Sequence, residues 1–165
     1  MHWYLVFTKP RLERCALQNL ENQGYPCYLP TLPTERLRQG AVALEPAPLF
    51  PRYLFIQLGQ DQSAKSWTPI HSTRGVSRLV RFGLEPAKVD ERLIQALKAH
   101  QQTFESQPER MFHPGERLRI ASGPFAGLEA VYQMSEGDRR VLVLIELLCK
   151  PVELRLAPTE LRKIA

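Results

Sequence analysis

The segment Leu49–Ile56 has the clearest alternation of side chains in the chain. Tyr53 and Phe55 alternate with Leu54 and Ile56, and the side chains of a β-strand point to opposite faces with period two. The pattern therefore predicts a strand with one aromatic and one aliphatic face. One face can lie in the core while the other binds a partner, although aromatic packing inside a central strand explains the same pattern.

Apolar runs around this strand predict an N-terminal α+β unit. Residues 3–7 are aromatic and apolar throughout, which is typical of a central strand. A helix is expected to begin at Pro10, which is tolerated in a first turn, and to stop at Gly24. Its predicted inner stripe consists of Leu12, Cys15, Ala16 and Leu20.

Further elements complete this unit. Residues 25–33 are predicted to be extended, residues 34–42 to form the tip of a hairpin, and the alternating residues 78–83 to form a half-exposed strand. Asp90 is a candidate cap for a final helix. The inner stripe of that helix is predicted to be Leu93, Ile94 and Leu97.

A second unit is expected after residues 100–113, which have little periodicity and are predicted to be a linker. Residues 114–165 contain about five short apolar segments separated by turns, typical of a small β-barrel. The run 141–148 is ambiguous, because Leu favours helix while Val and Ile favour strand. Pro124 and Pro151 oppose long helices at about 3 kcal/mol for each interior proline, so the barrel is the preferred prediction.

Composition and charge narrow the function classes. The 165 residues are 44% hydrophobic, enough for a buried core, and no apolar run approaches the roughly 20 residues that span a bilayer. The first residues lack a signal pattern, so we expect a cytoplasmic protein. Residues 1–98 contain 13 Lys and Arg against 8 Asp and Glu, whereas residues 99–165 contain 9 of each. The net charge of +5 thus lies in the N-terminal unit and fits an anionic partner such as nucleic acid.

Candidate catalytic chemistry is sparse. The three cysteines are widely spaced, which fits reduced thiols, and the four histidines are scattered, so we expect no metal and no cofactor. The sequence has no nucleophile with a matched base, no recognisable carboxylate pair and no phosphate loop. We therefore expect a binding protein rather than an enzyme.

Two sets of motifs occur in order along the chain. The N-terminal motifs are Trp3–Val6 before a helix, the Pro48–Ile56 strand, and Ser72–Val76 before Val80–Gly83. The C-terminal motifs are Pro114–Ile120 and Gly123–Gly127, which resemble a KOW motif. Taken together, these motifs resemble those of the NusG family of transcription elongation factors, and more closely its specialised RfaH-like paralogues.

The resemblance implies two domains of an α+β protein. Residues 1–99 would be an NGN domain, a four-stranded antiparallel sheet flanked by helices. The linker 100–113 would join it to a five-stranded KOW β-barrel at 114–165. A helical hairpin, in which RfaH-like factors mask their polymerase-binding site, is the alternative for the C-terminal domain.

The resemblance also implies partners. The N-terminal domain would bind the clamp helices of the RNA polymerase β′ subunit and disfavour pausing and termination in selected operons. The polymerase-binding positions would be Phe50, Pro51, Tyr53 and Phe55. A basic and polar patch would contact the non-template DNA strand through Lys9, Arg11, Arg14, Asn19, Gln23, Arg38, Gln39 and Arg74.

The C-terminal domain would have two kinds of contact. Arg140 matches the C-terminal partner of an interdomain ion pair, and Glu45 substitutes for the acidic partner, which aligns with Ala47. Phe125 and Ile145 are candidate contacts for a small-subunit ribosomal protein. The expected protein is a monomer. Two alternatives remain open, a general NusG-like elongation factor and a ribosome-associated KOW module that binds RNA.

Overall fold

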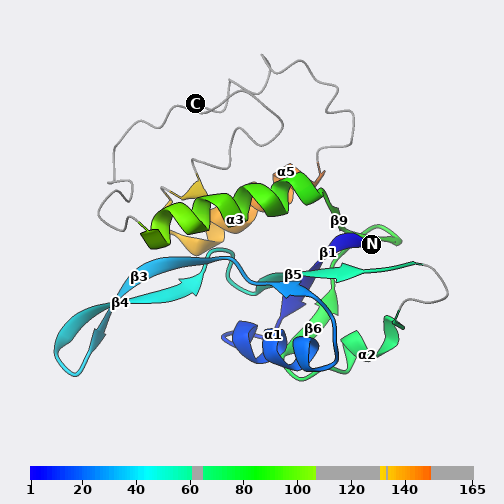
Figure 1. Cartoon of the computed structure of the whole chain (residues 1–165), viewed down its shortest axis with the longest axis horizontal. Helices are drawn as coiled ribbons and strands as arrows, with labels where there is room; N and C mark the ends of the chain where they lie inside the picture. Colours follow the sequence, from blue (N-terminus) through cyan, green and yellow to red (C-terminus); the bar gives the residue numbers. More distant parts are fainter. Residues whose placement is uncertain (61–64, 107–130, 133, 150–165) are drawn as a thin grey trace, which may run out of the picture.

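The computed structural model describes residues 1–60, 65–106, 131–132 and 134–149. Its centre is an antiparallel sheet in the order β2-β5-β1-β6, with β9 also paired to β1 (Figure 1). The strands are β1 (His2–Thr8), β2 (Cys27–Tyr28), β5 (Tyr53–Leu58), β6 (Val76–Leu79) and β9 (Lys88–Val89). The predicted antiparallel sheet with flanking helices is confirmed, and β9 adds a short strand to the four of the main path.

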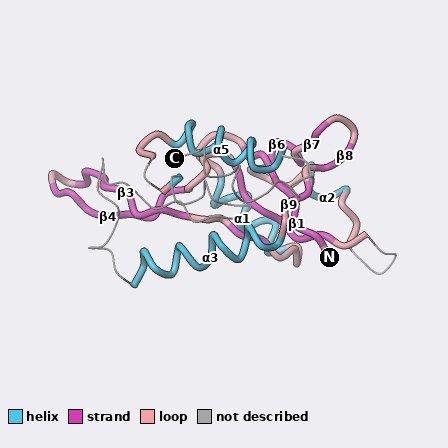
Figure 2. Tube along the Cα trace, turned by 90° about the horizontal axis from the view of Figure 1, so that it is seen from above, coloured by secondary structure: helices cyan, strands magenta, loops and turns pink. Residues whose placement is uncertain are grey.

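Helices cover both faces of this sheet. Helices α1 (Glu13–Asn22) and α2 (Thr68–His71) lie on one face. Helices α3 (Glu91–Ser106) and α5 (Gly137–Cys149) lie side by side on the other (Figures 1 and 2). The sheet is therefore the middle layer of the described part.

The register of β1 and β5 creates two cores. Leu5 pairs with Phe55 and Phe7 with Tyr53, so these four side chains share a face with α3 and α5. The opposite face is mainly aliphatic and packs on α1. Its strand residues are Tyr4, Val6, Leu54, Ile56 and Leu58. The predicted division of β5 into an aromatic and an aliphatic face is confirmed.

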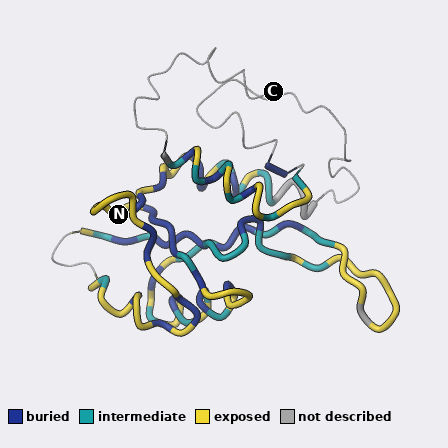
Figure 3. Tube along the Cα trace, turned by 180° about the vertical axis from the view of Figure 1, so that it is seen from behind, coloured by how far each residue is buried: buried dark blue, intermediate teal, exposed yellow. Residues whose placement is uncertain are grey.

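A long hairpin extends from this body. Strands β3 (Thr31–Arg38) and β4 (Ala41–Pro48) pair along their whole length. The turn residues Gln39 and Gly40 both have positive φ, 51° and 78°, as a tight hairpin turn requires. The predicted hairpin is confirmed, and its distal half is exposed (Figure 3). A second, short ribbon consists of β7 (Arg81–Phe82) and β8 (Glu85–Pro86).

Two predicted helix boundaries were wrong. Helix α1 begins at Glu13 rather than Pro10, because Arg11 has a φ of 64°, which no α-helix contains, and Leu12 is consequently exposed. The helix predicted after Asp90 is confirmed, with the Asp90 carboxylate accepting a hydrogen bond from the Arg92 N–H. It continues to Ser106, so residues 100–106 of the expected linker are helical.

The largest correction concerns one segment of the C-terminal unit. The rest of the predicted barrel, at residues 114–130 and 150–165, lies outside the described residues. Residues 141–148, preferred as a barrel strand, lie in α5, so the helical alternative applies to this segment. The helix buries Leu144 and Leu147 against the rest of the protein and exposes Leu142 and Glu146, a spacing that matches a helix rather than a strand. Pro151 follows the end of α5 at Cys149 and leaves it intact.

No helix in the described ranges is long and apolar enough to cross a membrane.

Gly75 allows the loop before β6 to lie against α1. Its φ is 93°, and an added Cβ would lie 2.8 Å from the backbone nitrogen of Ala16. We expect Gly75→Ala to lower the free energy of unfolding by about 3 kcal/mol, because left-handed alanine costs about 1–2 kcal/mol and overpacking adds about as much. Urea denaturation of the full chain measures this loss.

Gly40→Ala is the matched control. Gly40 also has a positive φ, of 78°, but nothing lies within 4 Å of its added Cβ. The free energy of unfolding of this variant should fall only by the cost of left-handed alanine, about 1 kcal/mol. Equal losses in the two variants would show that the approach of Gly75 to α1 is unimportant.

Candidate functional site

The residues predicted to bind polymerase gather where β5 begins. The side chains of Phe50 and Phe55 are fully buried, and their ring centroids lie 6.4 Å apart in an edge arrangement. Pro51 and Tyr53 are half-buried, and the Tyr53 ring lies 5.1 Å from that of Phe7. We call Phe50, Pro51, Tyr53 and Phe55 the β5 aromatic surface. In this structure it is packed against other parts of the chain.

Helix α5 contacts this surface at its first turn. The Arg140 Nε donates a 2.6 Å hydrogen bond to the carbonyl oxygen of Leu49. Gly137 lies so close to Pro51 that an added Cβ would be 2.5 Å from the proline Cγ. The start of α5 therefore lies directly on the backbone that leads into β5.

Apolar and aromatic contacts hold α5, and the two described residues 131–132 that precede it, against the same core. Leu144 is fully buried, and Val131 and Tyr132 belong to the same cluster as Phe50 and Phe55. The Tyr132 ring lies 5.2 Å from that of His100, and its hydroxyl donates to the Leu97 carbonyl of α3 at 3.4 Å. Burial, with a smaller effect from Tyr28, raises the pKa of Tyr132. This hydroxyl is therefore neutral at physiological pH.

The predicted ion pair between Glu45 and Arg140 is not the contact that holds α5. Arg140 is buried, and its described hydrogen bonds go to the carbonyl oxygens of Leu49 and Met134. Burial lowers the pKa of Arg140. The Arg140 guanidinium is directed at the backbone before β5. Glu45 lies half-buried in β4, opposite Thr34.

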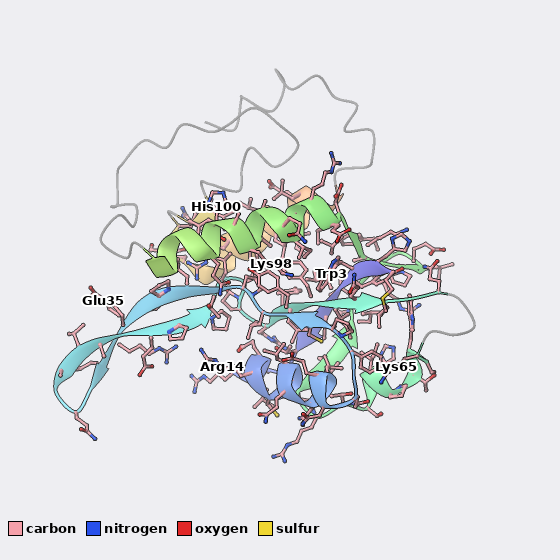
Figure 4. All side chains as sticks on the ribbon, viewed as in Figure 1. Trp3, Arg14, Glu35, Lys65, Lys98 and His100 are labelled. Atoms are coloured by element: carbon pink, nitrogen blue, oxygen red, sulfur yellow. The ribbon has the colours of Figure 1, made fainter. Side chains whose placement is uncertain are left out.

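The basic candidates of the DNA patch lie around α1. Lys9, Arg11, Arg14 and Arg74 are all exposed. Arg14 extends from α1 toward the hairpin and donates a 2.7 Å hydrogen bond to the Pro46 carbonyl (Figure 4). Lys9, Arg11 and Arg74 therefore remain as exposed cations, while Arg14 also orients the hairpin relative to α1.

The amide candidates of the patch are engaged inside the protein. Asn19 donates to the Arg74 carbonyl at 3.2 Å. Gln23 donates to the Thr73 hydroxyl at 2.8 Å and to the carbonyl of Asn19 at 3.2 Å. These bonds connect α1 to the loop that ends at Gly75. Their geometry indicates a positioning role for the two amides rather than free base-reading groups.

The other candidate residues are dispersed. Gln39 is exposed at the hairpin tip, and Arg38 ends β3, with its side chain outside the described part. Phe125 lies outside the described residues. Ile145 is half-buried in α5 and packs against the core that includes Phe50.

The sequence reasoning missed several contacts of the sheet face. Lys98 of α3 places its Nζ 5.5 Å from the Trp3 ring and 5.3 Å from the Tyr28 ring (Figure 4). The contacts of Gly137 and Arg140 with the residues before β5 were also missed, because a helix start offers no signal of its docking place. Phe7, Arg52 and Arg78 form a further cluster with Tyr53, described below.

Metal and thiol chemistry find little support in the described residues. No three His, Cys, Asp or Glu residues among them come together as metal ligands. Burial, with a smaller effect from Glu21, raises the pKa of the Cys27 thiol to about 12. Cys27 is therefore protonated at neutral pH and a poor nucleophile.

Comparisons with known proteins identify the family of this chain. Residues 1–98 match the family model described as transcription termination factor nusG. The transcription termination/antitermination protein NusG of Pseudomonas aeruginosa is 24% identical, over 96% of this chain and 97% of its own length. The protein of that name from Thermus thermophilus is 27% identical, over 93% of this chain and 95% of its own.

Another relative and a solved structure extend the comparison. NusG of Escherichia coli is 27% identical, over 90% of this chain and 84% of its own length. A structure described as domain interaction in Thermotoga maritima NusG matches with a TM-score of 0.45 and 20% identity, over 75% of this chain and 74% of the other. Because the family model covers more than half of its residues, the chain belongs to the NusG family of transcription termination and antitermination proteins.

Proposed function

We propose that this protein is a specialised, RfaH-like elongation and antitermination factor whose polymerase-binding surface is covered by its own helix α5. Residues 1–99 would bind the β′ clamp helices through the β5 aromatic surface, and the family match over residues 1–98 supports that boundary. One observation carries the proposal. The first turn of α5 contacts Pro51 through Gly137 and the Leu49 carbonyl through Arg140, where the candidate residues meet.

Coverage of the surface favours the specialised interpretation. A covered binding site would lower the affinity of a general elongation factor for every polymerase without adding selectivity. A covered site must open before it can bind. In a factor restricted to selected operons, binding to a DNA element can trigger this opening. A ribosome-associated RNA-binding module leaves the aromatic surface beneath α5 without a role.

The contact of α5 is suited to opening. The Arg140 guanidinium is a buried cation whose described partners are neutral carbonyl groups, and it lies in the first turn of α5, where the helix dipole disfavours positive charge. Apolar burial, chiefly of Leu144 and Leu147, must therefore supply the favourable free energy. A partner that buries Tyr53 and Phe55 as well as α5 does can therefore replace α5.

The non-template DNA strand would bind through the exposed cations Lys9, Arg11 and Arg74, with Gln39 at the hairpin tip as an additional polar contact. Phosphate contacts by such side chains give affinity that falls with salt. Asn19 and Gln23 would position the loop that carries Arg74, because their amides donate to its residues. Base specificity would then depend on the placement of the loop that carries Arg74 and on the polar groups near that loop.

A ribosomal link through the C-terminal domain belongs to the open state in this proposal. Ile145 packs into the core beneath α5 and could reach a small-subunit ribosomal protein only after α5 leaves the sheet. The same opening would thus release both surfaces. The expected site of action is the bacterial cytoplasm, where transcription and translation meet.

Leu144→Ala should promote polymerase binding. Truncating this buried leucine removes about 2–5 kcal/mol of packing from the covered state, and 1.4 kcal/mol is a factor of ten. We therefore expect the full-length variant to bind paused elongation complexes at least about tenfold more tightly than wild type. Adding Tyr53→Ala should abolish this gain, which fluorescence anisotropy with labelled complexes measures.

The matched control is Leu142→Ala on the same helix. Leu142 is 64% exposed, so its truncation changes helix propensity equally but removes little packing. It should leave affinity within about twofold of wild type. Equal tightening by both variants, or none by Leu144→Ala despite a retained fold by circular dichroism, would contradict the covered-site proposal.

Binding should depend on the sequence of the non-template strand. Full-length protein is compared on paused complexes that differ only in that strand, at two salt concentrations. Lys9→Gln, Arg11→Gln and Arg74→Gln should each weaken binding and lower the salt dependence by about one ion. Lys88→Gln is the control, since Lys88 is exposed and pairs with Tyr4 toward the other end of β1. Equal binding to all strands would indicate a general NusG-like factor.

A further inference from the structure

A row of side chains crosses three strands and includes Tyr53 of the β5 aromatic surface. Tyr53 of β5 pairs with Phe7 of β1, and Phe7 pairs with Arg78 of β6, so all three point to one face of the sheet. Arg52 joins them from the residue before β5, with its Cζ 4.0 Å from the Phe7 ring centroid. The Cζ of Arg78 lies 5.3 Å from the same ring. We call these four residues the Phe7 cluster.

The backbone holds Arg52 in an unfavourable conformation. Its φ is 72°, in the left-handed region that favours glycine or asparagine over a long side chain. Its Nε donates to the Thr8 carbonyl at 3.1 Å, and its own carbonyl accepts from the Thr8 N–H at 2.8 Å. These bonds fix the guanidinium over Phe7. Such a strained residue beside a binding surface is a candidate for function.

The two guanidinium groups are available to a partner. Arg78 is exposed and Arg52 half-exposed, and within the described residues neither forms an ion pair with a carboxylate. A guanidinium stacked on a ring retains N–H donors at its edge, which match the paired oxygens of a carboxylate. Two such groups beside Tyr53 form a cationic rim around an aromatic contact, the usual arrangement of a protein interface.

Building on the proposed function, we propose that Arg52 and Arg78, ordered by Phe7, bind carboxylate side chains on the polymerase segment that contacts Tyr53. The cluster does not suit a stacked nucleobase, because Arg52 already covers the Phe7 ring and Tyr53 lies tilted against it. The cluster also lies on the sheet face of α3 and α5, opposite the face covered by α1. The partner is therefore an acidic protein surface with an apolar ridge.

The test uses full-length protein, as wild type and as Leu144→Ala, on elongation complexes with bacterial RNA polymerase. Arg52→Asn and Arg78→Gln should each weaken binding about fivefold to tenfold, and Arg78→Glu should weaken it further, because reversal adds repulsion. The double neutral variant should also reduce the salt dependence of affinity. Asparagine tolerates the positive φ at Arg52, and circular dichroism verifies the fold.

Arg81→Gln is the matched control, since this exposed arginine, three residues beyond Arg78, has its described hydrogen bond with the Leu84 carbonyl. If Tyr53→Ala weakens binding and the Arg52 and Arg78 variants do not, the rim is refuted while the proposed function stands. If Tyr53→Ala has no effect, both fail. If Arg78→Gln and Arg78→Glu are equal, or Arg81→Gln weakens binding as much, a specific carboxylate contact is refuted. Loss of strand dependence in the Arg52 and Arg78 variants would assign them to DNA and overturn the proposal.

Discussion

The antiparallel register of β1 and β5 is the constraint on which the rest of the structure depends. By pairing Leu5 with Phe55 and Phe7 with Tyr53, it places the rings of Phe7, Tyr53 and Phe55 on one face of the sheet. The other face is closed by α1, whose Ala16 and Leu20 are fully buried. The aromatic face is wider than α3 alone covers, so α5 completes its core.

This division gives the two faces different roles. The core beneath α1 is built from residues between positions 4 and 79, so all of it comes from the N-terminal part of the chain. The core beneath α5 joins Phe50 and Phe55 to Leu144, about ninety residues later in the sequence. A contact between such distant segments can separate without unfolding the sheet, provided that another surface then covers the aromatic residues. Under the proposed function, the aromatic face is therefore the place where helix α5 and an external partner would exclude each other.

Local sequence determined most of the N-terminal fold. The alternation in β5, the hairpin turn and the helix after Asp90 all follow from periodicity and turn chemistry, and each was predictable. Long-range contacts were not predictable from the sequence. Arg11 and Arg52 adopt positive φ although neither residue type favours it, and the hydrogen bonds of Asn19 and Gln23 depend on a loop about fifty residues away. The basic residues of the candidate site could be recognised, but not which of its polar groups were already engaged.

The segment 141–148 shows why its fold was predicted wrongly. With period two, apolar residues occupy both faces except at Glu146, which suits a buried strand. With helical spacing, Leu144 and Leu147 face inward while Leu142 and Glu146 face outward. Propensity does not distinguish the two, so the environment decides, and here the environment is the aromatic face of another part of the chain. The conformation of this segment thus depends on its packing against that face. Under the proposed function, a partner that binds Tyr53 and Phe55 would also remove the apolar contacts that favour α5.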